Sequence, residues 1–233
     1  MIKIEHFIFN AFQARCSVVW DEAGNCAIVD PGCSTPEETD TLKNFISSKG
    51  LTPVCIMLTH CHFDHMCGMS ELAKEYEIPV YAHANEIHTL DQANPYICKA
   101  LDLPLPQTFP IIKTISEAAI PSRHVSIYGG DIIDVGSLRF EVLETPGHTT
   151  GGVCFLERKE KVLFSGDTLF AGAIGRSDFP GGDYDMLMKS IFEKIISLDS
   201  DIDVIPGHGP LTDIATEGMT NPFLQPFNEP YNE

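Results

Sequence analysis

The sequence predicts one α/β domain over residues 1–233, because strand and helix signals alternate along the chain. Residues 16–30 and 153–167 each hold two β-rich runs around a polar turn, which is typical of a β-hairpin. Residues 184–198 place apolar side chains on one helical stripe: Leu187, Ile191, Ile195 and Leu198. A chain of 233 residues can bury one substantial core, so no second domain is expected.

A helix is expected after the first hairpin, because residues with known end preferences mark both of its ends. Ser34 or Thr35 can cap its first turn, and Pro36 suits the first helical position. Gly50 is a typical stop. Its acidic first turn and its apolar face consist of Glu37 and Glu38, and of Leu42, Phe45 and Ile46.

A proline-rich segment, residues 84–125, interrupts the regular pattern in the middle of the chain. It is longer than an ordinary connector, so we expect it to cover the site and to shape the substrate pocket. The tail from residue 221 is expected to dock through Phe223 and Phe227, or to pack between subunits of a homo-oligomer. The remaining expected elements are strands at 54–58, 79–83, 138–145 and from 203, and a helix at 69–78.

Composition bears on partners and location. The chain has 15 Lys and Arg against 33 Asp and Glu, a net charge of -18 that repels nucleic acid and anionic membranes. The N-terminus lacks the pattern of a signal peptide, and no run of apolar residues is long enough to cross a bilayer, so we expect a cytoplasmic protein. The eight cysteines form no CxxC pair and are expected to be reduced.

Seven residues with metal-binding side chains follow predicted strands. Four lie in "LTHCHFDHMCG", after the strand at 54–58, and three follow later strands at turns rich in glycine. Imidazole and carboxylate groups together suit Zn, Fe or Mn. The alternative is that they are capping or core polar residues, but so many buried and unpaired groups would cost a few kcal/mol each. The seven are His60, His62, Asp64, His65, His148, Asp167 and His208.

These residues resemble the metallo-β-lactamase superfamily, whose HxHxDH signature stands here as His60, His62, Asp64 and His65. The stretches "GRSDFPGGD", "PGHGPLT" and "TNPFL" look like the short glyoxalase II branch, the hydroxyacylglutathione hydrolase group. The resemblance implies an αββα sandwich with two divalent metal ions, for which Zn is expected and Fe or Mn are alternatives. It assigns His60, His62 and His148 to the first metal, Asp64, His65 and His208 to the second, and Asp167 to both.

Two cations held close together can activate a bridging water as hydroxide near neutral pH. The resemblance therefore implies a hydrolase in which a metal-bridged hydroxide attacks a carbonyl, with Asp64 and Asp167 as catalytic residues. The motifs contain no obvious general acid. A thiolate can leave without one, because the pKa of its conjugate acid is only about 8.5. A thioester of a small thiol is therefore the expected substrate.

Three alternatives stay open: a persulfide dioxygenase with one Fe(II), a lactone or β-lactam hydrolase, and a metal-binding module without turnover. Arg176 and Phe170 are expected substrate contacts, although Arg176 could instead form an ion pair with Asp178. Cys61 is expected to be a buried bystander between ligands, and Glu217 a surface or structural carboxylate. The other histidines are expected on the surface or in packing contacts: His6, His83, His88 and His124.

Overall fold

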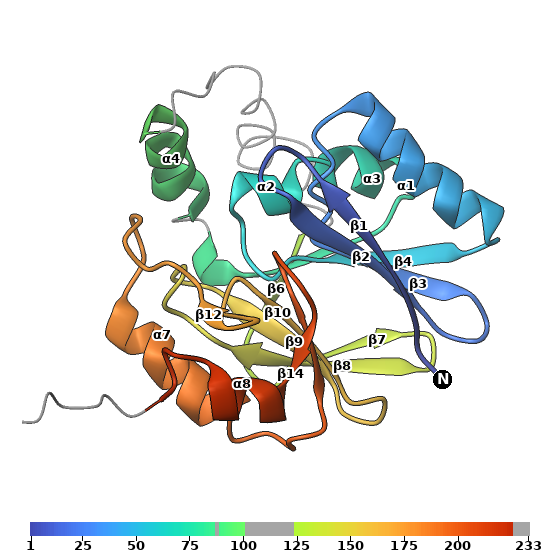
Figure 1. Cartoon of the computed structure of the whole chain (residues 1–233). Helices are drawn as coiled ribbons and strands as arrows, with labels where there is room; N and C mark the ends of the chain where they lie inside the picture. Colours follow the sequence, from blue (N-terminus) through green and yellow to red (C-terminus); the bar gives the residue numbers. More distant parts are fainter. Residues whose placement is uncertain (87–88, 101–123, 226–233) are drawn as a thin grey trace, which may run out of the picture.

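Two six-stranded sheets pack face to face in the computed structural model, which describes residues 1–86, 89–100 and 124–225 (Figure 1). The first sheet has the order β1-β2-β3-β4-β5-β6. Its β1/β2 and β2/β3 pairs are antiparallel, and its other pairs are parallel. Its strands are β1 (Lys3–Phe9), β2 (Ala14–Trp20), β3 (Asn25–Val29), β4 (Thr52–Met57), β5 (Val80–His83) and β6 (His124–Ile127).

The second sheet has the order β14-β13-β10-β9-β8-β7, and its β10/β13 pair is the parallel one. Both predicted hairpins are present: β2 and β3 form the first, and β9 and β10 the second. The strands of this sheet are β7 (Ile132–Val135), β8 (Leu138–Glu144), β9 (Val153–Glu157), β10 (Val162–Gly166), β13 (Asp203–Pro206) and β14 (Thr212–Asp213). A separate small sheet holds β11 (Leu169–Phe170) and β12 (Ala173–Ile174).

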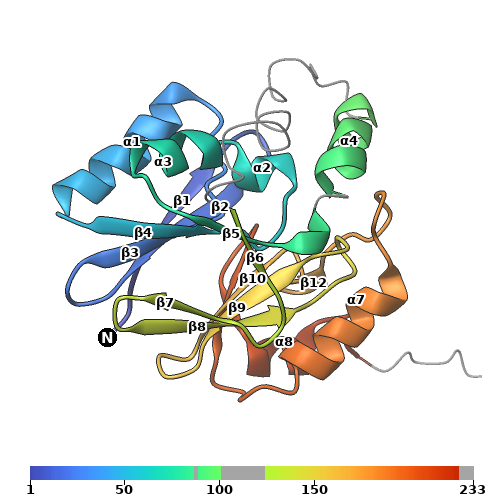
Figure 2. The same ribbon diagram turned by 180° about the vertical axis from the view of Figure 1, so that it is seen from behind.

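Helices cover the outer face of each sheet, as the view from behind also shows (Figure 2). One apolar cluster fills the space between the sheets, a second lies beneath α1 and α3, and a third beneath α7 and α8. The predicted αββα sandwich is confirmed. The helices are α1 (Pro36–Ser48), α2 (Phe63–Met66), α3 (Met69–Glu75), α4 (Asn94–Ala100), α7 (Tyr184–Ser190) and α8 (Ile214–Thr220).

The predicted helix ends agree with the structure. Thr35 caps α1, and its hydroxyl accepts a hydrogen bond from the Glu38 amide at 3.2 Å. Gly50 follows the helix with a φ of +64°, a conformation that glycine adopts without strain. The stripe of residues 184–198 is also confirmed, although its second half, Ile191–Ile195, is a π-helical turn (η3).

One expectation was wrong, and another was wrong in part. Residues 84–86 and 89–100 are not irregular: they form η1 (Ala84–Glu86), η2 (Thr89–Ala93) and α4, and Pro95 lies in the first turn of α4, where its ring is tolerated. The other prolines of that segment lie outside the described residues. In the tail, Leu224 is buried while Phe223 is 46% exposed, so docking through Phe223 is wrong. Phe227 lies outside the described residues, and packing of the tail between subunits stays a prediction.

Strand β1 was not predicted, although it pairs with β2 over its whole length. All eight cysteines are free, and seven are buried. Burial raises the pKa of the thiols, to about 12 for Cys26, so they stay protonated at neutral pH. Among the helices of the described residues, none is long and apolar enough to span a membrane.

Candidate metal centre

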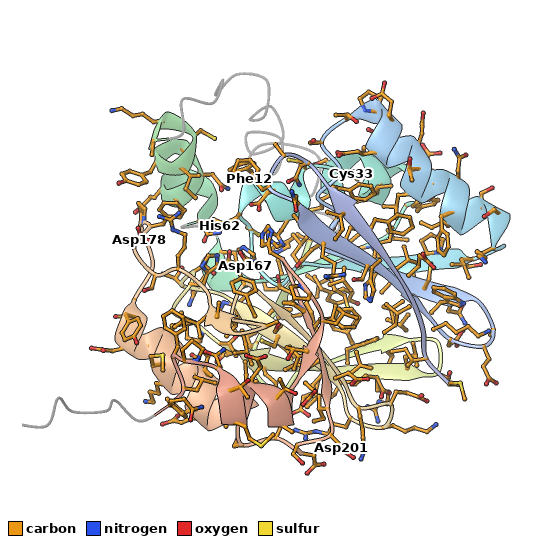
Figure 3. All side chains as sticks on the ribbon, in the orientation of Figure 1. Phe12, Cys33, His62, Asp167, Asp178 and Asp201 are labelled. Carbon is orange, nitrogen blue, oxygen red and sulfur yellow. The ribbon has the colours of Figure 1, made fainter. Side chains whose placement is uncertain are left out.

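The seven predicted ligands meet at one edge of the sandwich, where strands of both sheets end (Figure 3). Strands β8 and β10 both run antiparallel to β9, and β13 runs parallel to β10, so the three point the same way. Their carboxyl ends carry His148, Asp167 and His208, respectively. The HxHxDH segment follows β4 of the other sheet. Figure 3 shows His62 and Asp167 at this edge, with Asp201 at the far end of the molecule.

The histidines of the predicted first site form a tight group. One ligand atom from each of His60, His62 and His148 lies within 4.8 Å of the others. His62 Nδ1 and His148 Nε2 are 2.9 Å apart, although they come from different sheets. All three side chains are buried.

A second group adjoins the first and contains Asp64, His65 and His208, again with ligand atoms within 4.8 Å. His65 Nε2 and His208 Nε2 are 3.1 Å apart, and His208 Nε2 lies 3.4 Å from Asp64 Oδ2. His65 is fully buried, whereas His208 is the most exposed of the seven.

Asp167 lies between the two groups. Its Oδ1 is 3.4 Å from His65 Nε2, and its Oδ2 is 3.5 Å from both His148 Nε2 and His208 Nε2. One carboxylate thus faces nitrogens of both groups, as a bridging ligand must. The assignment of individual residues to individual metals stays a prediction.

The donor atoms fit a pair of divalent cations. His60 Nε2, His62 Nε2 and Asp167 Oδ1 are buried without a hydrogen-bond partner, which would be costly if nothing else satisfied them. Ring nitrogens of different histidines also point at each other at about hydrogen-bond distance. Cations bound by these lone pairs would satisfy the unpartnered atoms and would also explain why the ring nitrogens face each other. The mixed imidazole and carboxylate set suits Zn, Fe or Mn.

The charges around the two groups differ. Burial, followed by the neighbouring histidines, lowers the pKa of His60 and of His62 well below the usual value, so these two rings are neutral. Burial would also lower the pKa of His65, but Asp167, Asp64 and Asp30 outweigh it and raise the pKa to about 10. The carboxylates of Asp167, Asp64 and Asp30 therefore surround the second group with negative charge, which stabilises a cation there.

Two of the ligand histidines are oriented by a backbone carbonyl on the far side of the ring. His148 Nδ1 donates to the Arg176 carbonyl at 2.7 Å, and His208 Nδ1 donates to the Phe12 carbonyl at 3.0 Å. Such outer contacts hold a ring in the tautomer that presents a lone pair to a metal.

Asp30 orients ligands of both groups and was not among the predicted site residues. Its Oδ2 lies 3.2 Å from His65 Nδ1 and accepts from the Thr59 hydroxyl, which is 3.1 Å from His60 Nδ1. Asp30, His60 and His65 also have ligand atoms within 4.8 Å. Because both Asp30 oxygens are already hydrogen-bonded, we interpret this set as support for the centre and not as a third metal site. The available signal was that both predicted hairpins end in an aspartate.

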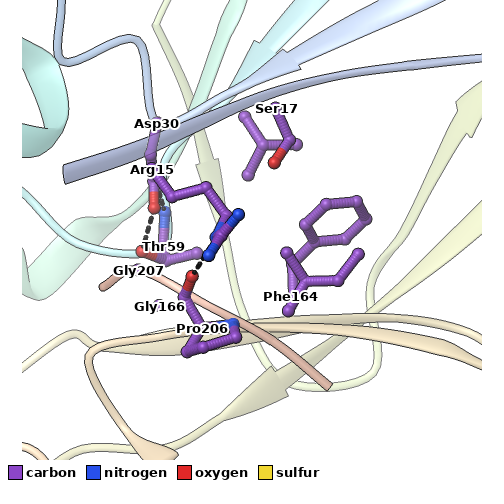
Figure 4. A pocket seen from close by; sticks show the side chains of 10 residues that line it. Arg15, Ser17, Asp30, Thr59, Phe164, Gly166, Pro206 and Gly207 are labelled. Carbon is purple, nitrogen blue, oxygen red and sulfur yellow. Dashed lines mark hydrogen bonds between the residues drawn. The ribbon is translucent and has the colours of Figure 1, made fainter. Parts of the chain in front are cut away.

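Arg15 is a second contributor that the sequence did not reveal (Figure 4). It lines a small cavity of about 10 Å³ behind the ligands, together with Asp30 and Thr59. Its Nε donates to the Pro206 carbonyl at 3.0 Å, and its backbone amide donates to the Gly207 carbonyl at 2.7 Å. The start of β2 therefore holds the turn that carries His208.

A pocket of about 180 Å³ opens beside the ligands. Arg176 lines it, forms two hydrogen bonds of 2.8 Å to Asp178, and lies 3.6 Å from the Phe179 ring centre, so it is both a pocket residue and an ion-pair partner. Phe170 is not a lining residue; its ring lies 6.2 Å from that of His208. Besides Arg176, the lining consists of five predicted ligands and four apolar residues: His62, Asp64, His148, Asp167, His208, Phe12, Phe63, Ile97 and Phe179.

The residues expected to play no metal role lie outside these groups. Cys61 is buried and belongs to none of them. His83 bonds Glu144 at 3.1 Å and His6 bonds Ser17 at 2.9 Å, whereas His124 is exposed and His88 lies outside the described side chains. Glu217 is not on the surface: it is 1% exposed and is a structural carboxylate.

Comparisons with known proteins agree with this architecture. The chain is 36% identical to hydroxyacylglutathione hydrolase GloC of Haemophilus influenzae over 223 residues, which cover 96% of this chain and 98% of that protein. Among solved structures, the BLEG-1 B3 metallo-beta-lactamase has a TM-score of 0.78 at 31% identity, covering 96% of this chain and 100% of that one. TTHA1623, solved in a di-iron-bound form, has a TM-score of 0.77 at 32% identity, covering 94% and 100%. The family model for the metallo-beta-lactamase superfamily matches residues 9–208, and the chain belongs to this superfamily.

Proposed function

We propose that this metallo-hydrolase uses two divalent metal ions to cleave the thioester bond of a small-thiol conjugate. Two observations support the metals: the complete set of seven ligand side chains, and the carboxylate of Asp167 between the two groups. The name of the GloC relative, a hydroxyacylglutathione hydrolase, supports the substrate class.

The observation that carries the thioester assignment is the absence of a free proton donor among the described residues of the pocket. The four apolar side chains cannot donate a proton, and the histidines and aspartates are needed as ligands. Hydrogen bonding to Asp178 raises the pKa of Arg176, so its guanidinium keeps its protons. A thiolate can leave from such a pocket, whereas an alkoxide or an amide nitrogen needs a proton.

The chain's own residues would divide the work as follows. His60, His62 and His148 would hold one cation, Asp64, His65 and His208 the other, and Asp167 would contact both. When bound, such a pair of cations lowers the pKa of a water toward 7 and polarises a carbonyl.

The pocket walls would bind the organic part of the substrate. Phe12, Phe63 and Phe179 offer apolar surface for acyl and thiol groups, and exclude water from the reacting carbonyl. Arg176 would face an anionic group of the substrate, with its guanidinium held in place by Asp178 and Phe179.

The test compares a thioester with the oxyester of the same acyl group. The metal-loaded protein should release thiol from the thioester at least about 100-fold faster than alcohol from the oxyester, because only the alkoxide needs protonation. Thiol release would be followed with a chromogenic thiol reagent, and metal content by elemental analysis. The same preparation would also be assayed for hydrolysis of a chromogenic β-lactam and of a lactone, and for oxygen uptake with a persulfide in an oxygen electrode. Oxygen uptake by a protein with one iron, without thioester cleavage, would refute the proposal in favour of the dioxygenase.

A further inference from the structure

A buried carboxylate behind the first group of ligands has no assigned role. Glu86, at the end of η1, is 2% exposed, and within the described part of the chain its partners are uncharged. Its Oε2 accepts from the Cys61 amide at 2.7 Å. Its Oε1 accepts from the Thr149 hydroxyl at 2.7 Å and from the Gly151 amide at 2.9 Å. A buried carboxylate without a cation is retained only where several donors satisfy it.

These donors flank the ligands of the first group. Cys61 lies between His60 and His62, and Thr149 directly follows His148. Glu86 itself follows β5, so its side chain joins the loop after β4 of one sheet to the loop after β8 of the other. The contact of 2.9 Å between His62 and His148 crosses the same boundary between the sheets.

The fit around Glu86 is close. A Cβ atom at Gly151 would lie 2.9 Å from Glu86 Oε1 and 2.8 Å from His83 Nδ1, so a larger residue there would push the loop away. One backbone hydrogen bond, from the Val153 amide to the Thr59 carbonyl at 2.9 Å, also links the two sheets near this point. On the side of His148 this bond starts at Val153, farther along the chain than Thr149 and Gly151, so the contacts of Glu86 lie nearer to His148.

We propose that Glu86 is a positioning residue that sets the spacing of His148 from His60 and His62, and thereby the metal affinity of that group. The inference rests on the two-metal centre of the proposed function. It does not depend on the substrate, because metal binding can be measured without turnover. It also predicts a selective effect, since the donors of Glu86 flank no ligand of the second group.

Glu86→Gln is the most direct variant, because it keeps the shape of the side chain. In either orientation, its NH₂ group must face a backbone N–H, of Cys61 or of Gly151, so one of the two loops loses its acceptor. The matched control is Glu217→Gln. Glu217 is equally buried and accepts from Gly172, Thr212 and Asn221, none of which adjoins a ligand.

The experiment titrates each metal-free protein with Zn²⁺ against a chromophoric chelator, and with Co²⁺ to record the absorption bands of each site. In Glu86→Gln, one equivalent should bind about 10- to 100-fold more weakly, the other should be unchanged, and the Co²⁺ bands of the three-histidine site should shift. Glu217→Gln should bind both equivalents as the native protein does. Native affinities in Glu86→Gln, or an equal loss in Glu217→Gln, would overturn the proposal.

A second pair of variants covers the case in which Glu86→Gln does not fold. Thr149→Val removes one donor to Glu86 and should weaken the same equivalent, whereas Thr149→Ser keeps the hydroxyl and should restore it. Equal affinities in these two variants would count against the link. A protein that shows these metal effects but cleaves no thioester would support the role of Glu86 and refute only the proposed function.

Discussion

At the residue scale, Asp167 and His208 make different contacts, and these predict different metal losses. Asp167 faces nitrogens of both groups, so Asp167→Ala should lower the occupancy of both metals and abolish hydrolysis.

His208 belongs to the second group only, so His208→Ala should lose about one equivalent of metal. Its kcat should fall roughly 100-fold, which corresponds to about 3 kcal/mol. Elemental analysis and initial rates would measure both. If Asp167→Ala still bound two full equivalents of metal, Asp167 would not be a bridging ligand.

His6 should make the stability of the protein depend on pH. Burial, with a contribution from Arg15, lowers the pKa of His6 to about 4, against 6.5 when it is exposed. Between these values the unfolded chain binds more protons than the folded one, so the stability falls as the pH falls from 6.5 to 4. His6→Gln should remove about 1 to 2 kcal/mol of this loss, allowing for the partial exposure of the ring.

The measurement is urea unfolding of the native protein and of His6→Gln at pH 7.5 and pH 4.5. Both proteins are first treated with chelator, so that the ligand histidines contribute equally to the pH dependence of each. The difference in unfolding free energy between the two pH values should be smaller in His6→Gln than in the native protein. If the two proteins show the same difference, His6 does not titrate in this window.

At the scale of elements, the cap of α1 should have a measurable energy. Thr35→Ala removes the acceptor of the Glu38 amide and should lower the unfolding free energy by about 1 kcal/mol. Thr41→Ala is the control, because Thr41 lies on the exposed face of the same helix, where alanine is a better helix former. Urea unfolding of the two variants should therefore differ, and an equal loss of stability would contradict the capping role.

Helix α4 should influence which substrates are accepted. Ile97 on this helix lines the pocket next to the ligands, and it packs against Phe63. Ile97→Ala should lower kcat/KM about 10-fold for bulky apolar acyl groups and much less for acetyl, with metal content unchanged. Ile195→Ala is the control, since it deletes the same atoms from the core beneath α7. A uniform loss over all substrates, accompanied by loss of metal, would mean that α4 is structural.

At the scale of the whole molecule, the metal centre joins the two sheets. The HxHxDH segment follows a strand of the first sheet, and His148, Asp167 and His208 follow strands of the second, so metals bound by the proposed ligands would stabilise the folded state only. Removing them with a chelator should lower Tm by on the order of 10 °C, and adding Zn²⁺ back should restore it. Calorimetry would detect this change. An unchanged Tm would show that the sheets hold together without the metals.

The sequence by itself determined the parts that depend on local signals. Periodicity and polar turns predicted both hairpins and the 184–198 stripe, and end preferences predicted the first helix, since these depend on neighbours within a few residues. The seven ligand candidates were found for the same reason, because each follows a strand at a recognisable turn. Strand β1 was missed although its Ile and Phe residues are typical of a strand, and only the structure showed that it pairs with β2.

Only the tertiary structure decided what surrounds the ligands. Asp30, Arg15, Phe12 and Glu86 act on residues far away in the chain, and no spacing in the sequence announces contacts between loops of different sheets. The same holds for the carboxylate of Asp167, which lies between the two groups because β8, β10 and β13 run in one direction. Interactions between residues close in sequence determine which segments become helices and strands. The packing of the two sheets against each other determines the distances between side chains within the centre.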